Sequence, residues 1–281
     1  MSSIFQNNLL LDQVAIVTGG GTGIGVAIAR ELATLGATVV IASRKRENVE
    51  PAAAGLTKEV GRPVHALVCD VRDRAQVDTL VRDVVTTHGR IDMLINNGGG
   101  QFFSPAEAIT PRGWDAVVQT NLTGQWNITQ AVANGWMLAH GGRIVSITML
   151  TSRGFAGMAH SVAARAGVEA MTKTLAVEWA PRGITINAVA PGYIASTGLK
   201  RYPDGVLVAE RLQTAVPMKR LGTCAEVAQS VAFLVSPAGA YITGQVLTID
   251  GGRSLWGDHW PIPDDGPLPT VVVPREPWET E

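Results

Sequence analysis

Cysteine is scarce in this chain of 281 residues, which holds only Cys69 and Cys224. Two cysteines so far apart exclude a disulfide framework and a thiolate metal cluster, and they fit a reducing compartment. No apolar run reaches the roughly 18 residues that a membrane helix needs, and the N-terminus lacks the basic and apolar regions of a signal peptide. We therefore expect a cytoplasmic protein with no membrane partner.

An excess of charge of one sign is also lacking, because 23 Lys and Arg residues face 24 Asp and Glu residues, for a formal net charge of −1. Without a basic field the chain cannot hold a phosphate polymer by charge, so we expect no nucleic-acid partner. Aromatic residues make up only 5% of the sequence, whereas hydrophobic residues as a whole make up 46%. That apolar content excludes a disordered chain and suffices for one large core.

What is present is an alternation of short β-branched runs with longer amphipathic stretches, which is typical of repeated βαβ units. The runs are nearly continuous in apolar residues, as strands covered by helices on both faces require. Three of the stretches between them, 23–36, 72–89 and 160–180, have apolar residues at three- and four-residue spacing. We therefore predict an α/β fold with a seven-stranded, doubly wound parallel sheet flanked by helices. The predicted strands are 13–18, 38–43, 64–70, 91–97, 143–148, 184–191 and 245–250.

Two segments depart from this alternation. Residues 193–221 combine mixed polarity with Pro203 and Pro217, and we expect them to form a mobile lid. The last residues, 253–281, are rich in proline, which suits neither a helix nor a central strand. We expect one domain over residues 1–252, followed by an extended, exposed tail that can pack on a neighbouring subunit.

A glycine-rich run at 18–25, Thr-Gly-Gly-Gly-Thr-Gly-Ile-Gly, follows the first predicted strand and opens into a helix. Gly19, Gly23 and Gly25 leave no side chain between the backbone and a ligand, and the helix N-terminus offers free N–H groups and a positive dipole to a pyrophosphate. Such glycines also occur where a turn needs them for packing alone. The order of strand, glycines and helix within one βαβ unit favours dinucleotide binding.

The end of the second predicted strand distinguishes NAD from NADP, because the 2′ position of the adenosine ribose lies there. NAD sites usually place a carboxylate at this point, but Ser43 and Arg44 stand here and no acid precedes Glu47. Arg44 can form two hydrogen bonds to a 2′-phosphate, so NADP (NADPH) is the expected cofactor; the alternative is a solvated basic loop. Asp70, after the third strand, is placed to accept hydrogen bonds from the adenine amino group or to cap the next helix.

Five motifs in the chain are together typical of one enzyme family. They are the glycine-rich run 18–25, Asp70-Val71, Asn96-Asn97-Gly98-Gly99, Asn121 and the run 187–192, Asn-Ala-Val-Ala-Pro-Gly. With these motifs the chain resembles a short-chain dehydrogenase/reductase over residues 12–252. The resemblance implies a single Rossmann-like domain that binds NAD(P), usually within a homotetramer or homodimer, and that delivers hydride at the carboxyl edge of the sheet.

The same resemblance implies which residues surround the cofactor. The backbone around Gly98 and the side chain of Asn97 should meet the adenosine ribose. The segment 191–194 should face the nicotinamide, and Ser196 or Thr197 should meet its amide or a phosphate. The expected cofactor-binding residues are Gly19, Gly21, Thr22, Gly23, Ile24, Ser43, Arg44, Asp70, Val71, Asn97, Gly98, Gly99, Arg165, Pro191, Gly192, Ile194 and Ser196.

The catalytic residues of the family do not all carry over. Members ordinarily use Ser, Tyr and Lys, with the Tyr four residues before the Lys. Here Ser161 takes the tyrosine position and Arg165 the lysine position, while Met149, next to Thr148, falls near the serine position. Asn121 is retained. The expected catalytic residues are therefore Asn121, Ser161, Arg165 and Thr148.

This replacement bears on the reaction. A phenol with a pKa of about 10, lowered by a cation, can exchange a proton with an alcohol near neutral pH, whereas a serine hydroxyl cannot do so readily. Reduction of a double bond conjugated to a thioester needs only donors for the charge on the carbonyl oxygen. Ser161 with Thr148 can supply them, and Arg165 can hold the ribose beside a fixed positive charge. We therefore expect an NADPH-dependent reductase whose small-molecule substrate is a 2-enoyl thioester.

Several stretches make the resemblance more specific, and they include the unusual Gly98 and Arg165. The stretches are 96–107, 120–125, 160–168, 242–245 and 250–256. They look closest to the peroxisomal trans-2-enoyl-CoA reductase branch, and more distantly to the 2,4-dienoyl-CoA reductases, which also place Ser at the tyrosine position. The chain ends in Glu-Thr-Glu rather than in a peroxisomal signal, which keeps the cytoplasm as the expected location.

Two other functions remain open. One is an NADP-dependent carbonyl or alcohol oxidoreductase for an apolar or terpenoid aldehyde or alcohol, with Tyr193 as the acid. The other is a non-catalytic NADP-binding scaffold, suggested by the three altered catalytic positions.

His160 precedes Ser161, but neighbouring helical residues point about 100° apart, so we expect no catalytic pair. Phe102 and Phe103 are expected to line an acyl channel or to cover the sheet edge.

Overall fold

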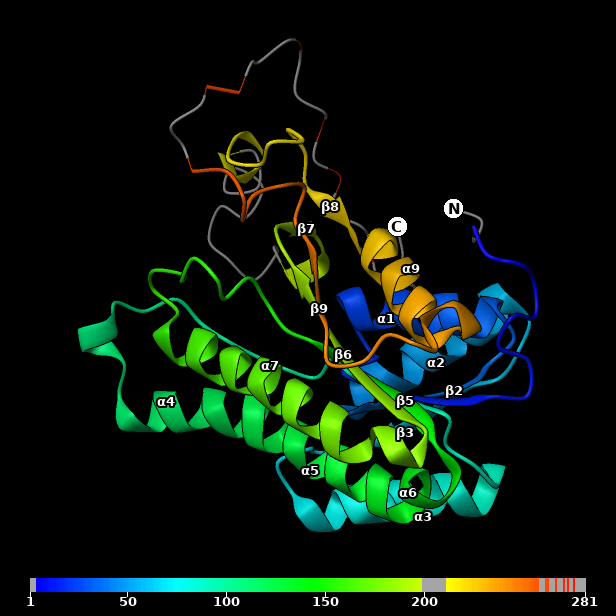
Figure 1. The fold of residues 1–281 in the computed structure, drawn as a ribbon. Coiled ribbons are helices and arrows are strands. Elements are labelled where there is room, and N and C mark those ends of the chain that lie inside the picture. Colours follow the sequence, from blue (N-terminus) through cyan, green and yellow to red (C-terminus); the bar gives the residue numbers. More distant parts are fainter. Residues whose placement is uncertain are drawn as a thin grey trace.

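The computed structural model of the chain describes residues 4–198 and 211–257, together with 261–262, 266, 270, 272 and 275. Its centre is a seven-stranded parallel sheet with the order β3-β2-β1-β4-β5-β6-β9 (Figure 1). The strands are β1 (Val14–Thr18), β2 (Thr38–Ser43), β3 (Val64–Val68), β4 (Met93–Asn96), β5 (Gly142–Ile147), β6 (Ile184–Pro191) and β9 (Val246–Ile249). The predicted sheet is confirmed, and apart from Gly142 every residue of these strands lies within its predicted range.

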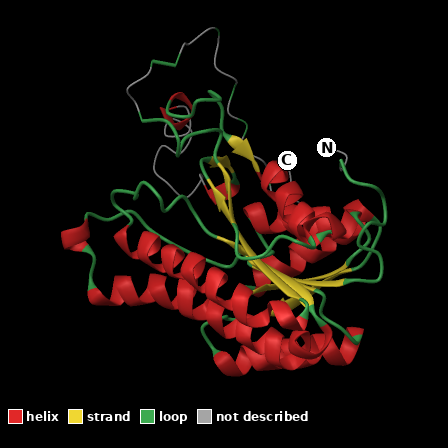
Figure 2. Ribbon diagram, viewed as in Figure 1, coloured by secondary structure: helices red, strands yellow, loops and turns green. Residues whose placement is uncertain are grey.

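Helices cover both faces of the sheet (Figure 2). One face carries α1 (Gly23–Thr34), α2 (Arg46–Val60) and α9 (Cys224–Val235). The other carries α3 (Arg74–His88), α5 (Gly124–Val132) and α7 (Ala159–Trp179). Each space between helices and sheet is filled by its own cluster of buried aliphatic side chains. The continuous apolar strands are therefore explained by burial on both sides.

Shorter elements connect these layers. They are the helices α4 (Pro111–Val118) and α6 (Leu138–His140), the 3-10 turns Ala106–Ala108, Ala180–Arg182 and Pro237–Gly239, and the π-helical turns η2 (Gln119–Thr123) and η3 (Ala133–Met137). No helix among the described residues is both long enough and apolar enough to cross a membrane.

The start of α3 corrects one expectation. Asp73 is the N-cap of this helix, because its carboxylate accepts hydrogen bonds from the backbone N–H groups of Ala75 and Gln76. The alternative that Asp70 caps the helix is therefore wrong. Asp70 lies too far before the first turn, and its carboxylate binds the side chain of Arg72 instead.

The start of the predicted lid pairs with the residues directly after its end in a small second sheet. There β7 (Ile194–Ala195) pairs in parallel with β8 (Gly222–Thr223). Thr223 and Glu226 then form a capping box that starts α9. Residues 199–210 of the predicted lid lie outside the described residues, as does most of the proline-rich tail.

Candidate active site

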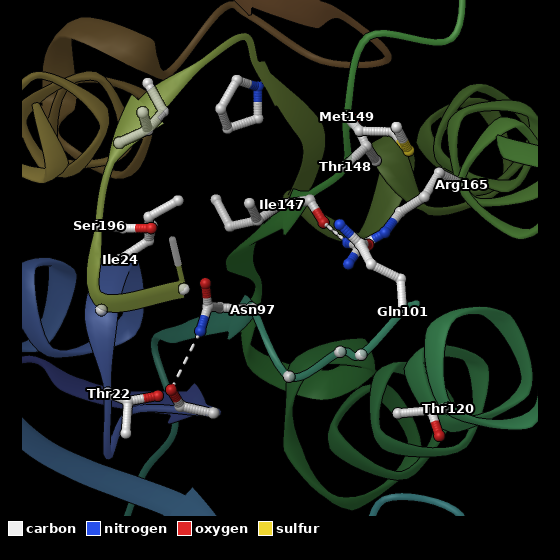
Figure 3. A pocket seen from close by; sticks show the side chains of 18 of the residues that line it. Thr22, Ile24, Asn97, Gln101, Thr120, Ile147, Thr148, Met149, Arg165 and Ser196 are labelled. Atoms are coloured by element: carbon white, nitrogen blue, oxygen red, sulfur yellow. Dashed lines mark hydrogen bonds between the residues drawn. The ribbon is translucent and has the colours of Figure 1, made fainter. Parts of the chain in front are cut away.

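The main cleft lies at the carboxyl edge of the sheet, beside the point between β1 and β4 where the strand order reverses (Figure 3). Its volume is about 1440 Å³. Sites for one small molecule usually measure about 300–1,000 Å³, so this cleft has room for a dinucleotide and a second molecule. Three expected site residues, Asp70, Asn121 and Ser161, do not line it. Those that do are Gly19, Gly21, Thr22, Gly23, Ile24, Ser43, Arg44, Val71, Asn97, Gly98, Gly99, Thr148, Arg165, Pro191, Gly192, Ile194 and Ser196.

The glycine-rich turn after β1 packs tightly against the loop after β4. A Cβ on Gly19 would lie 2.8 Å from the Cα of Gly98, and a Cβ on Gly25 would collide with the Gly19 carbonyl oxygen. The Asn97 side-chain amide donates to the carbonyl oxygens of Thr18 and Gly19, at 3.2 and 3.1 Å. Glycine is therefore required where the turn after β1 and the loop after β4 approach each other. The two hydrogen bonds from the Asn97 side chain hold the turn in place.

The N-terminus of α1 opens toward the cleft. Thr22 is its N-cap, but the side chain makes no capping hydrogen bond, and the first turn holds no acidic residue. The positive end of the helix dipole therefore points to a place that suits an anion. Thr197 lies close to this end, since a Cβ on Gly23 would be 3.4 Å from its Oγ1. With the glycine turn, these features fit the pyrophosphate of a dinucleotide.

Basic side chains border the adenosine end of the cleft. Arg44, directly after β2, lines the cleft and is exposed. Asp70 lies nearby, but its carboxylate accepts a hydrogen bond from Arg72 Nε at 2.9 Å. The hydrogen bond from Arg72 holds the pKa of Asp70 below its ordinary value, and the charge of Arg44 adds to this effect. Asp70 is thus already paired, whereas Arg44 and Lys45 both line the cleft.

Asn121 lies in the π-helical turn η2, between α4 and α5. A π-helical turn holds one more residue than a turn of an α-helix, and such turns recur at functional sites. The side chain is fully buried: its Nδ2 donates to the Gly100 carbonyl at 2.8 Å, and its Oδ1 accepts the Gly100 N–H at 3.0 Å. Asn121 therefore clamps the loop after β4 from behind rather than lining the cleft.

Arg165 extends from α7 to the end of β5, where its Nη1 donates to the Ile147 carbonyl oxygen (Figure 3). The residue is 7% exposed, its Nε has no hydrogen-bond partner among the described residues, and no ion pair within that part of the chain includes it. Burial lowers the pKa of the guanidinium to about 10, so it stays charged at neutral pH. A buried cation without a counterion is costly unless a ligand compensates it.

Ser161 lies one turn before Arg165 on α7 and is fully buried. Its Oγ donates to Gln101 Oε1 at 3.1 Å and is 3.6 Å from Met149 Sδ. Gln101 and Met149 line the cleft, whereas Ser161 does not. We expected the serine hydroxyl to face the substrate, but in the structure it faces the side chain of Gln101.

The hydroxyl of Thr148 also has protein partners. It donates to Glu169 Oε1 and to the Val189 carbonyl oxygen, each at 3.3 Å, and Thr151 donates to the other oxygen of Glu169 at 2.9 Å. Thr148 therefore ties β5 to α7 and β6. Sequence reasoning missed both Glu169 and Gln101, and for Gln101 the one available signal was its place directly after the glycines 98–100.

Aromatic side chains form the outer part of the cleft. Phe102, Phe103, Phe155 and Tyr193 line it, and the Phe155 and Tyr193 rings meet edge to face with centroids 6.4 Å apart. The two phenylalanines after β4 thus line the cleft rather than only covering the sheet edge. His160 Nδ1 accepts the backbone N–H of Ser161 at 2.8 Å.

Comparison with known proteins identifies the family. A family model described as enoyl-(acyl carrier protein) reductase matches residues 19–254. The (3E)-enoyl-CoA-producing peroxisomal 2,4-dienoyl-CoA reductase of Danio rerio is 40% identical over 254 residues, which cover 90% of this chain and 85% of the relative. The chain belongs to the short-chain dehydrogenase/reductase family. The resemblance inferred from the motifs is confirmed.

Two further relatives lie in the same short-chain dehydrogenase/reductase family. A probable 2,4-dienoyl-CoA reductase of Bacillus subtilis is 38% identical, over 89% of this chain and 99% of the relative. The solved structure of the citronellol catabolism dehydrogenase AtuB of Pseudomonas aeruginosa superposes with a TM-score of 0.81 at 40% identity, over 90% of this chain and all of AtuB. The chain is therefore a nicotinamide-dependent oxidoreductase similar to enoyl-CoA reductases.

Proposed function

We propose that this short-chain dehydrogenase/reductase is an NADPH-dependent reductase of the conjugated double bond of 2-enoyl thioesters. The observation that carries the proposal is the buried Arg165, a cation with no counterion among the described residues, where the family ordinarily has lysine. Tyr193 is the one tyrosine among the described residues that line the cleft, and it comes from the segment after β6 rather than from α7. The site thus offers fixed positive charge and hydrogen-bond donors in place of an acid that exchanges protons.

This arrangement suits charge that develops on a thioester oxygen. Bound NADPH would supply the hydride for the β-carbon. The electron pair of the double bond then moves toward the carbonyl, which leaves negative charge on its oxygen until the α-carbon takes a proton from water. Arg165 stabilises that charge from a site of low exposure, where an ionic interaction is stronger than in water. Asn121 keeps the loop after β4 in place, so the donors need no rearrangement during the reaction.

NADPH is favoured over NADH by Arg44. Its guanidinium lies at the adenosine end of the cleft, where a 2′-phosphate would be placed, and two parallel hydrogen bonds to a phosphate are the geometry that arginine provides. Asp70, the nearby carboxylate, is paired with Arg72 and so competes weakly for Arg44. An anionic 2′-phosphate would pair with the positive charge of Arg44.

The names of the relatives support acyl thioesters and leave a second candidate. Those of Danio rerio and Bacillus subtilis are named for 2,4-dienoyl-CoA, whose reduction puts charge on the same carbonyl oxygen. AtuB is named for citronellol catabolism, which favours the alternative of a terpenoid aldehyde or alcohol. In that alternative Tyr193 would be the acid, and the three altered catalytic positions would require another explanation. A scaffold without activity is the third possibility.

The test is the decay of NADPH absorbance with a medium-chain trans-2-enoyl-CoA. Parallel reactions contain NADH in place of NADPH, a 2,4-dienoyl-CoA of matched chain length, or an aldehyde of matched chain length. We expect turnover of the enoyl-CoA with NADPH and much slower turnover with NADH. Turnover of the aldehyde alone would move the chemistry to a carbonyl, and NADPH binding without turnover of any substrate would favour the scaffold.

We also propose that the enzyme forms a homodimer or homotetramer. The last strand, β9, is the edge of the sheet and carries Leu247, which is 37% exposed; Phe233 on α9 is equally exposed. An apolar sheet edge is normally covered, and pairing with a second copy would cover it. Sedimentation equilibrium tests this, since a monomer at micromolar concentration would contradict it.

A further inference from the structure

Two histidines meet at the edge of the sheet that lies opposite the cleft. His65 is the second residue of β3, and His88 is the last residue of α3. Since α3 leaves the carboxyl edge of a parallel sheet and runs back to the start of β4, its last residue lies at the amino edge. The centres of the two imidazole rings are 4.7 Å apart, and the ring planes are inclined by 57°. Neither residue lines the cleft, so the pair lies outside the candidate active site.

Both histidines are partly exposed, and the residues around them are packed. His65 lies on the same face of β3 as Leu67, because side chains alternate along a strand. Val84 and Val85, one turn before His88, belong with Leu67 to the aliphatic cluster between α3 and the sheet. This packing holds the two histidines in fixed positions, while the exposed part of each residue is accessible to an ion from the solvent.

The surroundings of the pair favour a cation that is bound by neutral imidazole. Burial, and then the charge of His65, lower the pKa of His88 below its ordinary value of 6.5, so this ring is neutral at pH 7 and one of its nitrogens carries a lone pair. The last carbonyl groups of α3 carry partial negative charge, which attracts a positive ion. Arg90, the next basic residue along the chain, donates two hydrogen bonds to the carboxylate of Asp92, at 2.8 and 2.7 Å. Its charge is therefore compensated by Asp92.

The spacing of the two rings fits a pair of metal ligands. An imidazole nitrogen lies about 2.0–2.1 Å from a bound zinc ion, and the centre of the ring lies roughly 1.1 Å beyond that nitrogen. Two imidazole rings that bind one ion at an angle of roughly 90–110° therefore have centres about 4.4–5.2 Å apart. The 4.7 Å between His65 and His88 falls within this range.

We propose that His65 and His88 bind a divalent transition-metal ion of the kind that prefers imidazole, such as Zn²⁺, through one ring nitrogen each. No group of three or more His, Cys, Asp or Glu side chains in the described part of the chain could hold a metal ion, so water completes the coordination shell. The ion connects β3, an edge strand of the sheet, to α3. It therefore stabilises the fold and takes no part in the reaction.

Calorimetric titration of the whole, metal-free enzyme tests the site. We expect one high-affinity site per chain for Cu²⁺, Ni²⁺ or Zn²⁺, with Cu²⁺ bound most tightly, and no binding of Mg²⁺, which prefers oxygen ligands. His65→Gln and His88→Gln should each weaken Zn²⁺ binding by at least about 10-fold, since the loss of even an outer partner of a metal ligand usually costs that much. His140→Gln is the matched control, because His140 is exposed and its ring stacks on Trp136, with centres 3.8 Å apart, rather than on a second histidine. Parent-like affinity for Zn²⁺ in both His65→Gln and His88→Gln would overturn the inference.

Two further measurements distinguish a metal site from a contact between two rings. The electron paramagnetic resonance spectrum of bound Cu²⁺ should show coupling to two imidazole nitrogens in the parent enzyme and to fewer in His65→Gln or His88→Gln. Zn²⁺ should raise the urea midpoint of the parent, because the ion binds the folded state, but not that of either variant. Each protein is compared with and without Zn²⁺, so a lower stability of the variant itself does not affect the result. An equal shift by Zn²⁺ in parent and variants would contradict the site.

A titration in the presence of the cofactor locates the ion. Cys69 lines the cleft, and a thiolate there would also bind Zn²⁺, but burial raises the pKa of this thiol to about 11 and keeps it protonated. Since the two histidines lie at the opposite edge of the sheet, saturating NADPH should leave the affinity for Zn²⁺ unchanged. Loss of Zn²⁺ binding when NADPH is bound would place the ion in the cleft and would overturn the inference.

Discussion

The guanidinium of Arg165 fills the space that a side chain on Gly99 would need. A Cβ built on Gly99 would lie 2.5 Å from Arg165 Nη2 and 2.7 Å from Asn121 Oδ1. The next residue of the loop, Gly100, has no atom of the described residues within 4 Å of such a Cβ. Arg165, Asn121 and Gly99 therefore pack closely against one another. Because Gly99 has no side chain, it leaves room for a guanidinium, which is larger than the ammonium group of lysine.

Gly99→Ala should displace Arg165 or the loop. Overpacking of this kind costs about 1–3 kcal/mol of folding free energy, and we expect kcat to fall because the cation is moved. Urea unfolding and steady-state kinetics measure the two effects. Gly100→Ala is the control, and it should be close to the parent in both. Equal losses in the two variants would contradict the specific contact with Arg165.

Arg165→Lys should reduce the cost of Gly99→Ala. Lysine has no second nitrogen to meet the new Cβ, so the stability lost on introducing alanine should be smaller when Arg165→Lys is already present. A double-mutant cycle based on urea unfolding gives the coupling free energy. A coupling of zero would mean that the clash with Asn121 alone sets the cost.

The pH dependence of kcat should follow the charge on Arg165. Burial lowers its pKa to about 10, so the cation is present at lower pH and is lost above that value. We expect kcat to be level from about pH 6 to pH 9 and to fall at higher pH, measured from initial rates in overlapping buffers. In Arg165→Lys the fall should begin at lower pH, because lysine starts from an ordinary pKa of about 10.4 and burial lowers it too. The same profile in both enzymes would contradict this assignment.

Arg44→Gln should weaken NADPH binding selectively. It removes a charged partner of the 2′-phosphate, so we expect KM for NADPH to rise by about 10- to 100-fold and KM for NADH to change little. Arg46→Gln is the matched control, because Arg46 is paired with Glu50 and does not line the cleft. Equal rises in KM for both cofactors in Arg44→Gln would remove this residue from the phosphate site.

Glu226→Gln tests the start of α9. The hydrogen bond from Arg220, with those from Thr223, lowers the pKa of Glu226 to about 2 from an ordinary 4.5. Because the pKa is depressed in the folded state, the ionised carboxylate stabilises the fold above about pH 4.5, and this contribution disappears as pH falls toward 2. We expect the variant to lose about 1 kcal/mol at pH 7 in chemical unfolding and to match the parent near pH 2.

Glu107→Gln controls for the loss of one surface charge, since Glu107 is exposed and lies in a 3-10 turn rather than in the first turn of an α-helix. It should not change the unfolding free energy at either pH. A Glu226→Gln deficit that stayed constant down to pH 2 would mean that the side chain acts by shape rather than by charge.

The fold could be predicted from the sequence because its signals are local. Continuous β-branched runs indicated the strands, and the order of strand, glycines and helix indicated the cofactor-binding turn. In that turn Gly19 and Gly25 are required because other backbone atoms lie too close for a side chain. The cap of α3 was missed because Asp70 and Asp73 are both plausible caps by residue type, and only the backbone path distinguishes them.

The catalytic end could be predicted only in part. The positions of Ser161 and Arg165 followed from motif spacing, but spacing along one helix does not tell which loop covers it. Gln101 lies 60 positions before Ser161, and their hydrogen bond depends on how β4 and α7 are brought together. The partners of Thr148 were missed for the same reason, since Glu169 meets it across the space between β5 and α7.

The central claim concerns which carbon is reduced, and isotope transfer tests it most directly. The enzyme is incubated with a trans-2-enoyl-CoA and NADPH deuterated at both C4 positions of the nicotinamide, and the product acyl group is analysed by mass spectrometry and NMR. The account predicts one deuterium at the β-carbon and a solvent-derived proton at the α-carbon. Deuterium on the carbonyl carbon, or consumption of NADPH only when an aldehyde is supplied, would contradict it.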